Sequence, residues 1–298
     1  MKTILSIGIL VLAIQSLTYG QEQTVPVKKV RISEFSLNSG SSTAPGIYMS
    51  VTDFRKLAPQ STLLDRDFTG FKTYSAMENK YQVFSALVGL QFRDKEKKGY
   101  NRNPLLRVGI SYFSGIELEK SLTKDTKTPI DTFYSTQNDL AYVDSVYHNG
   151  YDLRYTNNQI RLEGSLIFRT NQQLRWSWYA GIGITAGFSI NANTIIWNSV
   201  STYRETTYNN GDVYTSSSYK DNKNDSREEE FSNKNVVAFS GFLPLGVDFR
   251  IARKNELLKH VHLFLELRPG INSMVIPDLR TITTSTMQGG LGLKISLY

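Results

Sequence analysis

The feature that most constrains the fold of this chain is a run of alternating apolar and polar residues at 174–192. The even positions from Leu174 to Ile190 are apolar and include Trp176 and Trp178, whereas the odd positions are mostly polar or small. A period of two predicts a β-strand with one apolar face. Ordinary strands contain roughly 3–10 residues, so this run indicates a protein built from unusually long strands.

Seven further segments alternate in the same way, which predicts eight strands in total. These segments are 29–37, 82–94, 106–118, 159–169, 237–251, 261–275 and 285–298. The connections between them alternate in length. Short connections are expected at 95–103, 170–173 and 252–259, and long ones at 41–80, 119–155 and 193–234, with 277–283 on the same side as the long ones. This rhythm is typical of an antiparallel up-and-down barrel.

Charged residues lie on the strand faces opposite to the apolar ones. Those at mid-strand are Arg107, Arg161, Arg268, Glu163, Asp248 and Glu266, and those near the short connections are Arg175, Arg250, His262 and Lys294. In a soluble barrel the apolar faces would fill the interior and these charges would meet water. In a membrane barrel lipid contacts the apolar faces, and the charges pair inside a narrow lumen. We expect the membrane arrangement and keep a secreted up-and-down barrel as the alternative.

The N-terminus predicts export from the cytoplasm. Lys2 precedes an apolar stretch at 4–14, and the small residues Thr18 and Gly20 precede Gln21, which is the layout of a cleavable secretory signal. We therefore expect a signal peptide at 1–20 and one domain at 21–298, with an uncleaved anchor helix as the alternative. Export also argues against a nucleic-acid partner, although the net charge is +7. The mean hydropathy of −0.31 excludes a protein with several transmembrane helices.

These features resemble the small eight-stranded outer-membrane β-barrels of bacteria, the class of OmpX, the OmpA transmembrane domain and the PorT-like barrels. The resemblance covers 27–298 and includes the aromatic C-terminal Tyr298, although Tyr298 is out of phase with the apolar residues of its strand. It implies an all-β, eight-stranded antiparallel up-and-down transmembrane β-barrel with long extracellular loops, located in the bacterial outer membrane. The implied partners are the lipid bilayer and lipopolysaccharide, and the extracellular loops are open to protein partners.

The sequence offers few candidates for chemistry. His260 and His262 have a spacing that suits a metal, but no third ligand is evident, so we expect a structural role. Oxygen ligands for Ca²⁺ are present at Asp221, Asp225 and Glu228, but Lys223 and Arg227 lie among them and favour a solvated loop. We expect no metal and no cofactor.

His148, the one histidine expected on the long-loop side, is a weak candidate for catalysis. Asp144, Ser145 and Asp152 are its neighbours and supply a hydroxyl and carboxylates. The pattern is weak because the surrounding loop is polar throughout, and geometry defines such a site. A further prediction for the long loops is a short helix at 52–58, which lies on the surface or, less favoured, plugs the lumen.

The functional expectation is a non-enzymatic outer-membrane barrel with a structural or surface-binding role through its loops. The loop at 201–220 has the Tyr, Ser and Asn composition of an adaptable recognition surface. One alternative is an accessory subunit of a secretion or outer-membrane assembly complex. The other is a lipid-modifying outer-membrane enzyme that uses His148. No catalytic residue is expected.

Overall fold

The structure is a computed structural model, and it describes residues 29–47, 49–74, 78–94, 99–134, 140–171, 174–216, 225–252, 255 and 258–297. The signal peptide expected at 1–20 lies outside these residues, as do Asp221 and Tyr298. Across the described ranges, no helix combines the length and the apolar character needed to cross a membrane.

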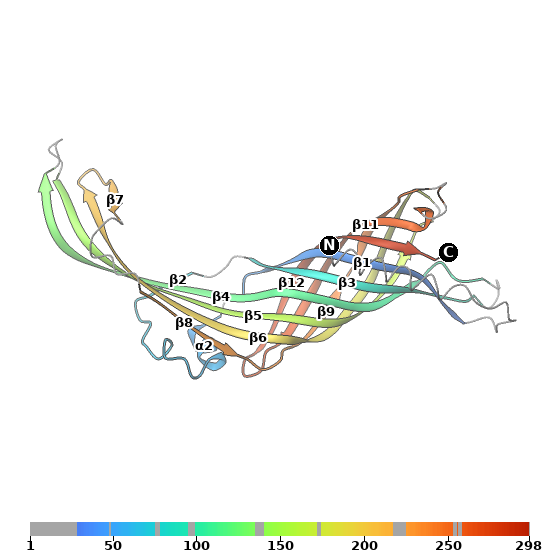
Figure 1. The fold of residues 1–298 in the computed structure, drawn as a ribbon, viewed down its shortest axis with the longest axis horizontal. Helices are drawn as coiled ribbons and strands as arrows, with labels where there is room; N and C mark the ends of the chain where they lie inside the picture. Colours follow the sequence, from blue (N-terminus) through green and yellow to red (C-terminus); the bar gives the residue numbers. More distant parts are fainter. Residues whose placement is uncertain are drawn as a thin grey trace.

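The described chain is dominated by antiparallel strands that close into a ring (Figure 1). The ring contains β1 (Val30–Pro45), β3 (Glu78–Phe92), β4 (Leu105–Tyr134), β5 (Leu140–Arg169), β6 (Trp176–Tyr208), β9 (Val237–Phe242), β10 (Leu245–Arg250), β11 (Val261–Val275) and β12 (Thr281–Ser296). β9 and β10 are two parts of one strand, because both pair with β6 and with β11. The break falls at Leu243 and Pro244, where proline lacks the N–H that a ladder needs. Pairing of β12 with β1 completes an eight-stranded barrel and confirms the predicted fold class.

The two faces of the barrel wall are arranged as predicted for a barrel in lipid. On β6, Ile182 is 58% exposed and Thr185, on the opposite face, is 4% exposed. The charged groups at mid-strand, such as Arg107 and Glu266, are buried in the interior. An apolar exterior around a polar interior is the arrangement of a transmembrane β-barrel.

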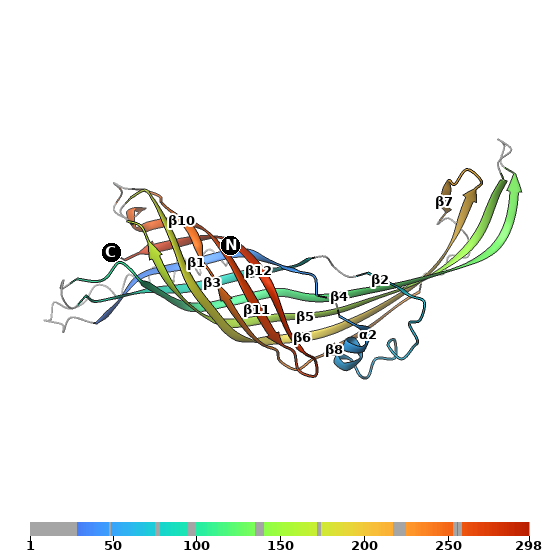
Figure 2. The ribbon, with the colours of Figure 1, turned by 180° about the vertical axis from the view of Figure 1, so that it is seen from behind.

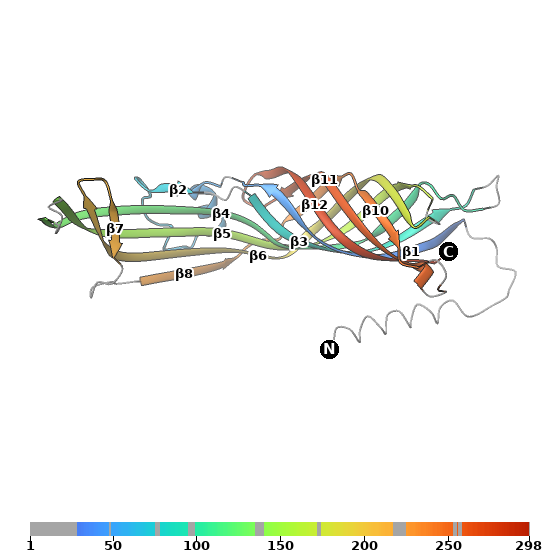
Figure 3. The same cartoon turned by 90° about the horizontal axis from the view of Figure 1, so that it is seen from above.

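The expected loops at 119–155 and 193–234 were wrong in one respect, because much of both is strand. β4, β5 and β6 continue past the ring. Residues 116–134 of β4 pair with 140–157 of β5, with one further bulge at Ile130, and 141–158 of β5 pair with 191–208 of β6. We call this part of the sheet the extension (Figure 1). Three short strands add to it: β2 (Lys72–Tyr74) pairs with β4, whereas β7 (Val213–Ser216) and β8 (Asp225–Ser232) pair with β6. Seen from above, the extension is a long, shallow ribbon leading away from the barrel (Figure 3).

Two irregularities mark the base of the extension. In β4 the register shifts between Phe113 and Ile116, with Gly115 at a φ of 77°. In β6, Ile190 has no partner, because Gln159 of β5 pairs with residue 189 and Asn158 with residue 191. Each bulge inserts one extra residue into its strand, which reverses the alternation of inward and outward side chains. The inward residues of β4 and β6 therefore change from odd to even positions.

The segment at 49–71 covers one face of the extension. It contains α2 (Val51–Leu57), which confirms the helix predicted at 52–58. Ser50 and Asp53 form a capping box, and the side chain of Phe54 is completely buried. Figure 2 shows α2 beside β6 and β8, outside the ring, so the helix does not plug the lumen. The extension core combines side chains of this segment with side chains of the sheet, namely Phe54, Leu57, Leu63, Leu64, Leu118, Leu122, Tyr151, Leu153, Tyr155 and Ile196.

Candidate binding surface and the closed barrel interior

The middle of the barrel interior is filled by an ion-pair network. Arg107 lies 2.8 Å from the Glu266 carboxylate, Arg268 lies 3.0 Å from Glu163 and also contacts Glu266, and the Tyr179 hydroxyl donates to Glu266 at 2.6 Å. These four charged groups are almost completely buried. Charges in such surroundings need partners, and here two arginines balance two glutamates.

A second group of charges lies between this network and the short turns. Arg169 pairs with Glu34 at 2.6 Å, and Lys294 contacts both Glu34 and Asp248. His262 Nδ1 lies 2.8 Å from Asp248. Glu34 was not among the predicted lumen charges, because it continues the spacing of the outward Val30 and Ile32. The register shift between Ile32 and Glu34 instead places it on the inward face with Ser36. A negative residue in a weakly alternating first strand was the available signal.

Arg161 departs from the expectation that every mid-strand charge is paired with an opposite charge. Within the described part of the chain, its guanidinium is held by neutral oxygens: Gln159 Oε1 at 2.8 Å, Asn272 Oδ1 at 2.8 Å and the Ser240 hydroxyl at 2.6 Å. The guanidinium also stacks over the ring of Phe113 at 4.1 Å. Strong hydrogen bonds and a cation–π contact therefore replace a carboxylate here.

The end of the lumen that faces the extension is closed by apolar side chains. Buried residues of this cap include Tyr81, Phe113, Val236, Met274 and Ile282, and the cap is continuous with the extension core. The interior thus changes from charged to apolar along the barrel axis. An eight-stranded barrel filled in this way is a packed interior and offers no wide aqueous path.

The structure does not bring together the catalytic candidates around His148. The residue pairs with Asp125 of β4, with 2.6 Å between Nδ1 and Oδ1, and Asp125 is far from the candidate residues in sequence. Ser145 is three positions away on the same strand and therefore points to the opposite face. Asp152 accepts a hydrogen bond from Ser121 at 2.5 Å. A nucleophile next to its base is not formed here.

The metal candidates are also separated. His260 ends the 3₁₀ helix η1 (Leu258–His260), whereas His262 lies inside the barrel on β11, so the expected common strand face was wrong. Asp225 and Glu228 lie on β8, where Asp225 is paired with Arg227 at 3.8 Å. Among the described residues, no group of His, Asp and Glu side chains is arranged to hold a metal ion.

The far end of the extension is the candidate binding surface. We define the tip patch as a set of exposed large side chains on β4, β5 and β7, namely Ile130, Phe133, Tyr134, Tyr142, Val213 and Tyr214. Tyr134 is 69% exposed, and Tyr208 packs against Tyr214 with 5.6 Å between ring centroids. By the strand register, Tyr134, Tyr142 and Val213 share one face of the sheet, and Phe133 and Tyr214 lie on the other. Exposed apolar groups concentrated at one end of a sheet are typical of an interaction site.

The tip patch lies beside an open strand edge. Residues 124–134 of β4 pair with β5 on one side, whereas β2 covers the other side only at 121–123, as far as the described residues extend. Lys124, Lys127 and Pro129 stand on this edge, and such residues discourage uncontrolled pairing with other chains. The edge therefore offers backbone groups that are able to pair with another strand. Its side chains limit which strands can do so.

No protein-family model matches the chain, and no curated protein matches it. Among solved structures it is similar to Neisserial surface protein A at 9% identity, over 91% of this chain and 100% of that one, with a TM-score of 0.25. It is also similar to Ail of Yersinia pestis, crystallised with the heparin analogue sucrose octasulfate, at 9% identity over 88% and 99% of the two chains, with a TM-score of 0.22. The P. putida toluene transporter TodX matches at 11% identity over 92% and 81%, with a TM-score of 0.22. The fold is assigned from the eight-stranded ring of this chain itself.

Proposed function

We propose that this protein is a non-enzymatic binding protein of the bacterial outer membrane, which contacts its partner through the tip patch and the open edge of β4. The observation that carries this proposal is the extension itself. It projects beyond a barrel whose lumen is filled, and it ends in exposed aromatic side chains beside a stretch of β4 that pairs on one side only, as far as the described residues show. A filled lumen supports anchoring more than transport.

The proposed orientation places the extension outside the cell and the short turns in the periplasm. Outer-membrane barrels have short periplasmic turns and long external segments. Both described ends of the chain, at Lys29 and Leu297, lie at the short-turn end of the ring. The apolar belt then contacts the lipid bilayer, including the acyl chains of lipopolysaccharide in the outer leaflet.

The proposed partner is a protein that presents an extended segment. Strand addition at an exposed edge uses main-chain hydrogen bonds for affinity and side-chain contacts for selectivity. The edge at 124–134 supplies the main chain, and Phe133 and Tyr134 supply aromatic contacts at its end. Aromatic side chains are the groups that most often dominate binding energy at protein interfaces.

Site-specific photo-cross-linking in living cells tests this proposal. A photoreactive residue at position 134 should capture a discrete partner, whereas the same residue at position 102, in the turn between β3 and β4, should not capture it. The double variant Phe133→Ser, Tyr134→Ser should abolish capture by a probe at position 130 without changing the amount of folded barrel. Absence of a specific product at position 134 would contradict a binding role for the tip.

The identity of the captured protein separates the proposal from its alternative. A soluble or host-surface protein supports a surface-binding role. A component of a secretion or assembly complex in the envelope would instead identify the protein as an accessory subunit of that complex.

A further inference from the structure

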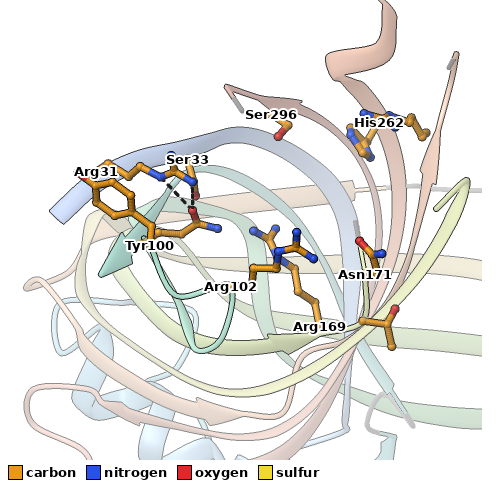
Figure 4. Close-up of a pocket in the computed structure, with 11 residues that line it drawn as sticks. Arg31, Ser33, Tyr100, Arg102, Arg169, Asn171, His262 and Ser296 are labelled. Carbon is orange, nitrogen blue, oxygen red and sulfur yellow. Dashed lines mark hydrogen bonds between the residues drawn. The ribbon is translucent and has the colours of Figure 1, made fainter. Parts of the chain in front are cut away.

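A polar cavity of about 310 Å³ opens at the short-turn end of the barrel, far from the extension. Four arginines from different elements line it: Arg31 at the start of β1, Arg102 in the turn after β3, Arg169 at the end of β5 and Arg250 at the end of β10. In Figure 4 the side chains of Arg102 and Arg169 extend into the space, while Arg31 and Tyr100 lie along one wall. The remaining lining is mostly hydroxyl and amide groups, including Ser33, Gln91, Asn171 and Ser296.

The cavity carries an excess of positive charge. Among the described residues, no carboxylate lines it. The carboxylates behind its inner wall are Glu34, which is paired with Arg169 and Lys294, and Asp248, which contacts Lys294 and His262. Among the described residues, Arg102, Arg169 and Lys294 stand near these two carboxylates, and Arg31 and Arg250 have interaction partners of their own. An excess of cations at a partly desolvated site favours the binding of an anion.

The cationic groups are held in place by neighbouring side chains. Both Nε and Nη2 of Arg31 donate to Gln91 Oε1, at 3.1 and 2.9 Å, and the guanidinium stacks over Tyr100 at 4.3 Å. The Asn103 amide exchanges two hydrogen bonds of 2.9 Å with the backbone of Arg169, which ties the turn that carries Arg102 to the end of β5. Sites that are fixed before binding lose less entropy when the ligand arrives.

We propose that this cavity binds a phosphate ester, through the guanidinium groups of Arg102, Arg169 and Arg31. Guanidinium groups match phosphate oxygens in a bidentate geometry and are the preferred partners of phosphate in proteins. The volume equals that of about ten liquid waters, so it exceeds a lone phosphate and leaves room for a polar carrier such as a glycerol or sugar unit. In the orientation proposed above, the cavity faces the periplasm, so the ligand would come from there.

Calorimetry on the full-length protein in a phosphate-free detergent solution tests this inference. Glycerol 3-phosphate should bind, glycerol should not, and binding should weaken as salt is added. Arg102→Gln should weaken the binding of glycerol 3-phosphate by about tenfold or more, and Arg31→Gln should weaken it in the same direction. Arg227→Gln removes the same charge from the exposed surface of β8 and should leave affinity unchanged.

The ligand could be a free ester or the headgroup of a phospholipid, and native mass spectrometry separates these sources. Protein in nanodiscs with phosphatidylglycerol should retain bound lipid if the headgroup is the ligand, and the Arg102→Gln variant should lose it. Binding of the soluble ester alone supports a free ligand. Either result upholds a phosphate site.

Three results would overturn the inference: no binding of glycerol 3-phosphate, equal binding of a dicarboxylate such as succinate, or equal weakening in the Arg227→Gln control. These measurements need only the folded barrel. Their failure would leave the proposed role of the tip patch standing, and loss of the partner at the tip would leave the phosphate site standing.

Discussion

The barrel and the extension share three long strands, yet the two regions bury opposite kinds of side chain. In β5 the odd-numbered residues point to one face along the whole strand. Within the barrel that face carries Gln159, Arg161 and Glu163, and within the extension it carries Leu153 and Tyr155. In the barrel, the apolar face contacts lipid and the polar face is buried. In the extension, which is surrounded by water, the apolar face is buried. The surrounding solvent therefore determines which face of the sheet is covered.

The bulges in β4 and β6 lie where this inversion occurs. They shift the phase of two strands at Gly115 and Ile190, while β5 inverts by a change of residue type alone. Ile182 of β6 faces outward in the barrel, and Ile196 of the same strand is completely buried in the extension core. We interpret the level of the two bulges as the boundary between the bilayer and the outer aqueous phase.

The largest expected effect comes from breaking the buried ion-pair network of the barrel. Glu266→Gln leaves Arg107 and Arg268 short of a carboxylate, and removing one partner of a buried pair costs about 3–5 kcal/mol. Reversible urea unfolding in lipid vesicles, followed by tryptophan fluorescence, measures the cost. The matched variant Glu117→Gln breaks a partly exposed pair of the extension with Arg154 and should cost less than about 1 kcal/mol. Equal costs would refute the contrast between the two regions.

A cavity in the extension core should weaken the extension and leave the barrel folded. Leu153→Ala removes a completely buried side chain, which costs about 2–5 kcal/mol. We expect faster hydrogen exchange and faster proteolysis in 116–157, with an unchanged shift between unheated and boiled samples on gels. The neighbouring Arg154→Ala, on the outer face, is the control. Joint unfolding of both regions would mean that they form one cooperative unit.

A charge on the outward face of β6 should be tolerated in the extension and rejected in the barrel. Ile182→Arg places the charge against lipid and should cost about 2–4 kcal/mol, which impairs membrane insertion. Trp197→Arg, on the outward face beyond the bulge, should insert normally because that residue contacts water. Thr185→Ser controls for change on the lumen face. Insertion yields in vesicles decide the matter, and equal yields for the two arginine variants would contradict the inversion.

The smallest expected effect concerns acid pH at the loop that covers the extension. Burial opposes ionisation of Glu229, but hydrogen bonds from Ser61, Thr62 and Leu63 outweigh it and hold the pKa of Glu229 below the usual 4.5. A depressed pKa stabilises the folded state above pH 4.5, and this stabilisation is lost as the pH falls through the folded value. Proteolysis of 49–71 by an acid protease should therefore accelerate below pH 4.5. Glu229→Gln should remove this pH dependence; if it stays, another group is responsible.

Much of the barrel was predictable because lipid imposes a simple rule on each strand. The alternation around Ile182 and Thr185 predicted the strand and its two faces, and all eight expected strands are present. The broken strand at Pro244 and the inward Glu34 had only weak signals in the sequence, namely a proline inside an apolar run and a carboxylate in a weakly alternating strand. Their outcome depends on register with neighbouring strands. A period of two does not reveal a bulge in the partner strand.

The sequence predicts loops where the extension forms, for a physical reason. Polar outward residues at 119–134 and 193–208 alternate with a few apolar ones, and the phase changes at Gly115 and Ile190 interrupt the pattern. The apolar residues at 54, 57, 63 and 64 that cover the extension lie far away in sequence, so their contact with it requires the folded structure. The cationic cavity was also hidden, because its arginines come from four separate connections and strand ends.

The most direct test of the inverted faces is the accessibility of single cysteines along β6, which is feasible because the chain has no cysteine of its own. In folded protein in bilayers, a fluorophore attached at position 182 should be quenched by a lipid-embedded quencher and shielded from water-soluble reagents. A cysteine at position 197 should react with a membrane-impermeant reagent and escape lipid quenching, and one at position 196 should escape both. Quenching by lipid at 197, or free reaction with water-soluble reagents at 182, would contradict a sheet that crosses the membrane boundary between these residues.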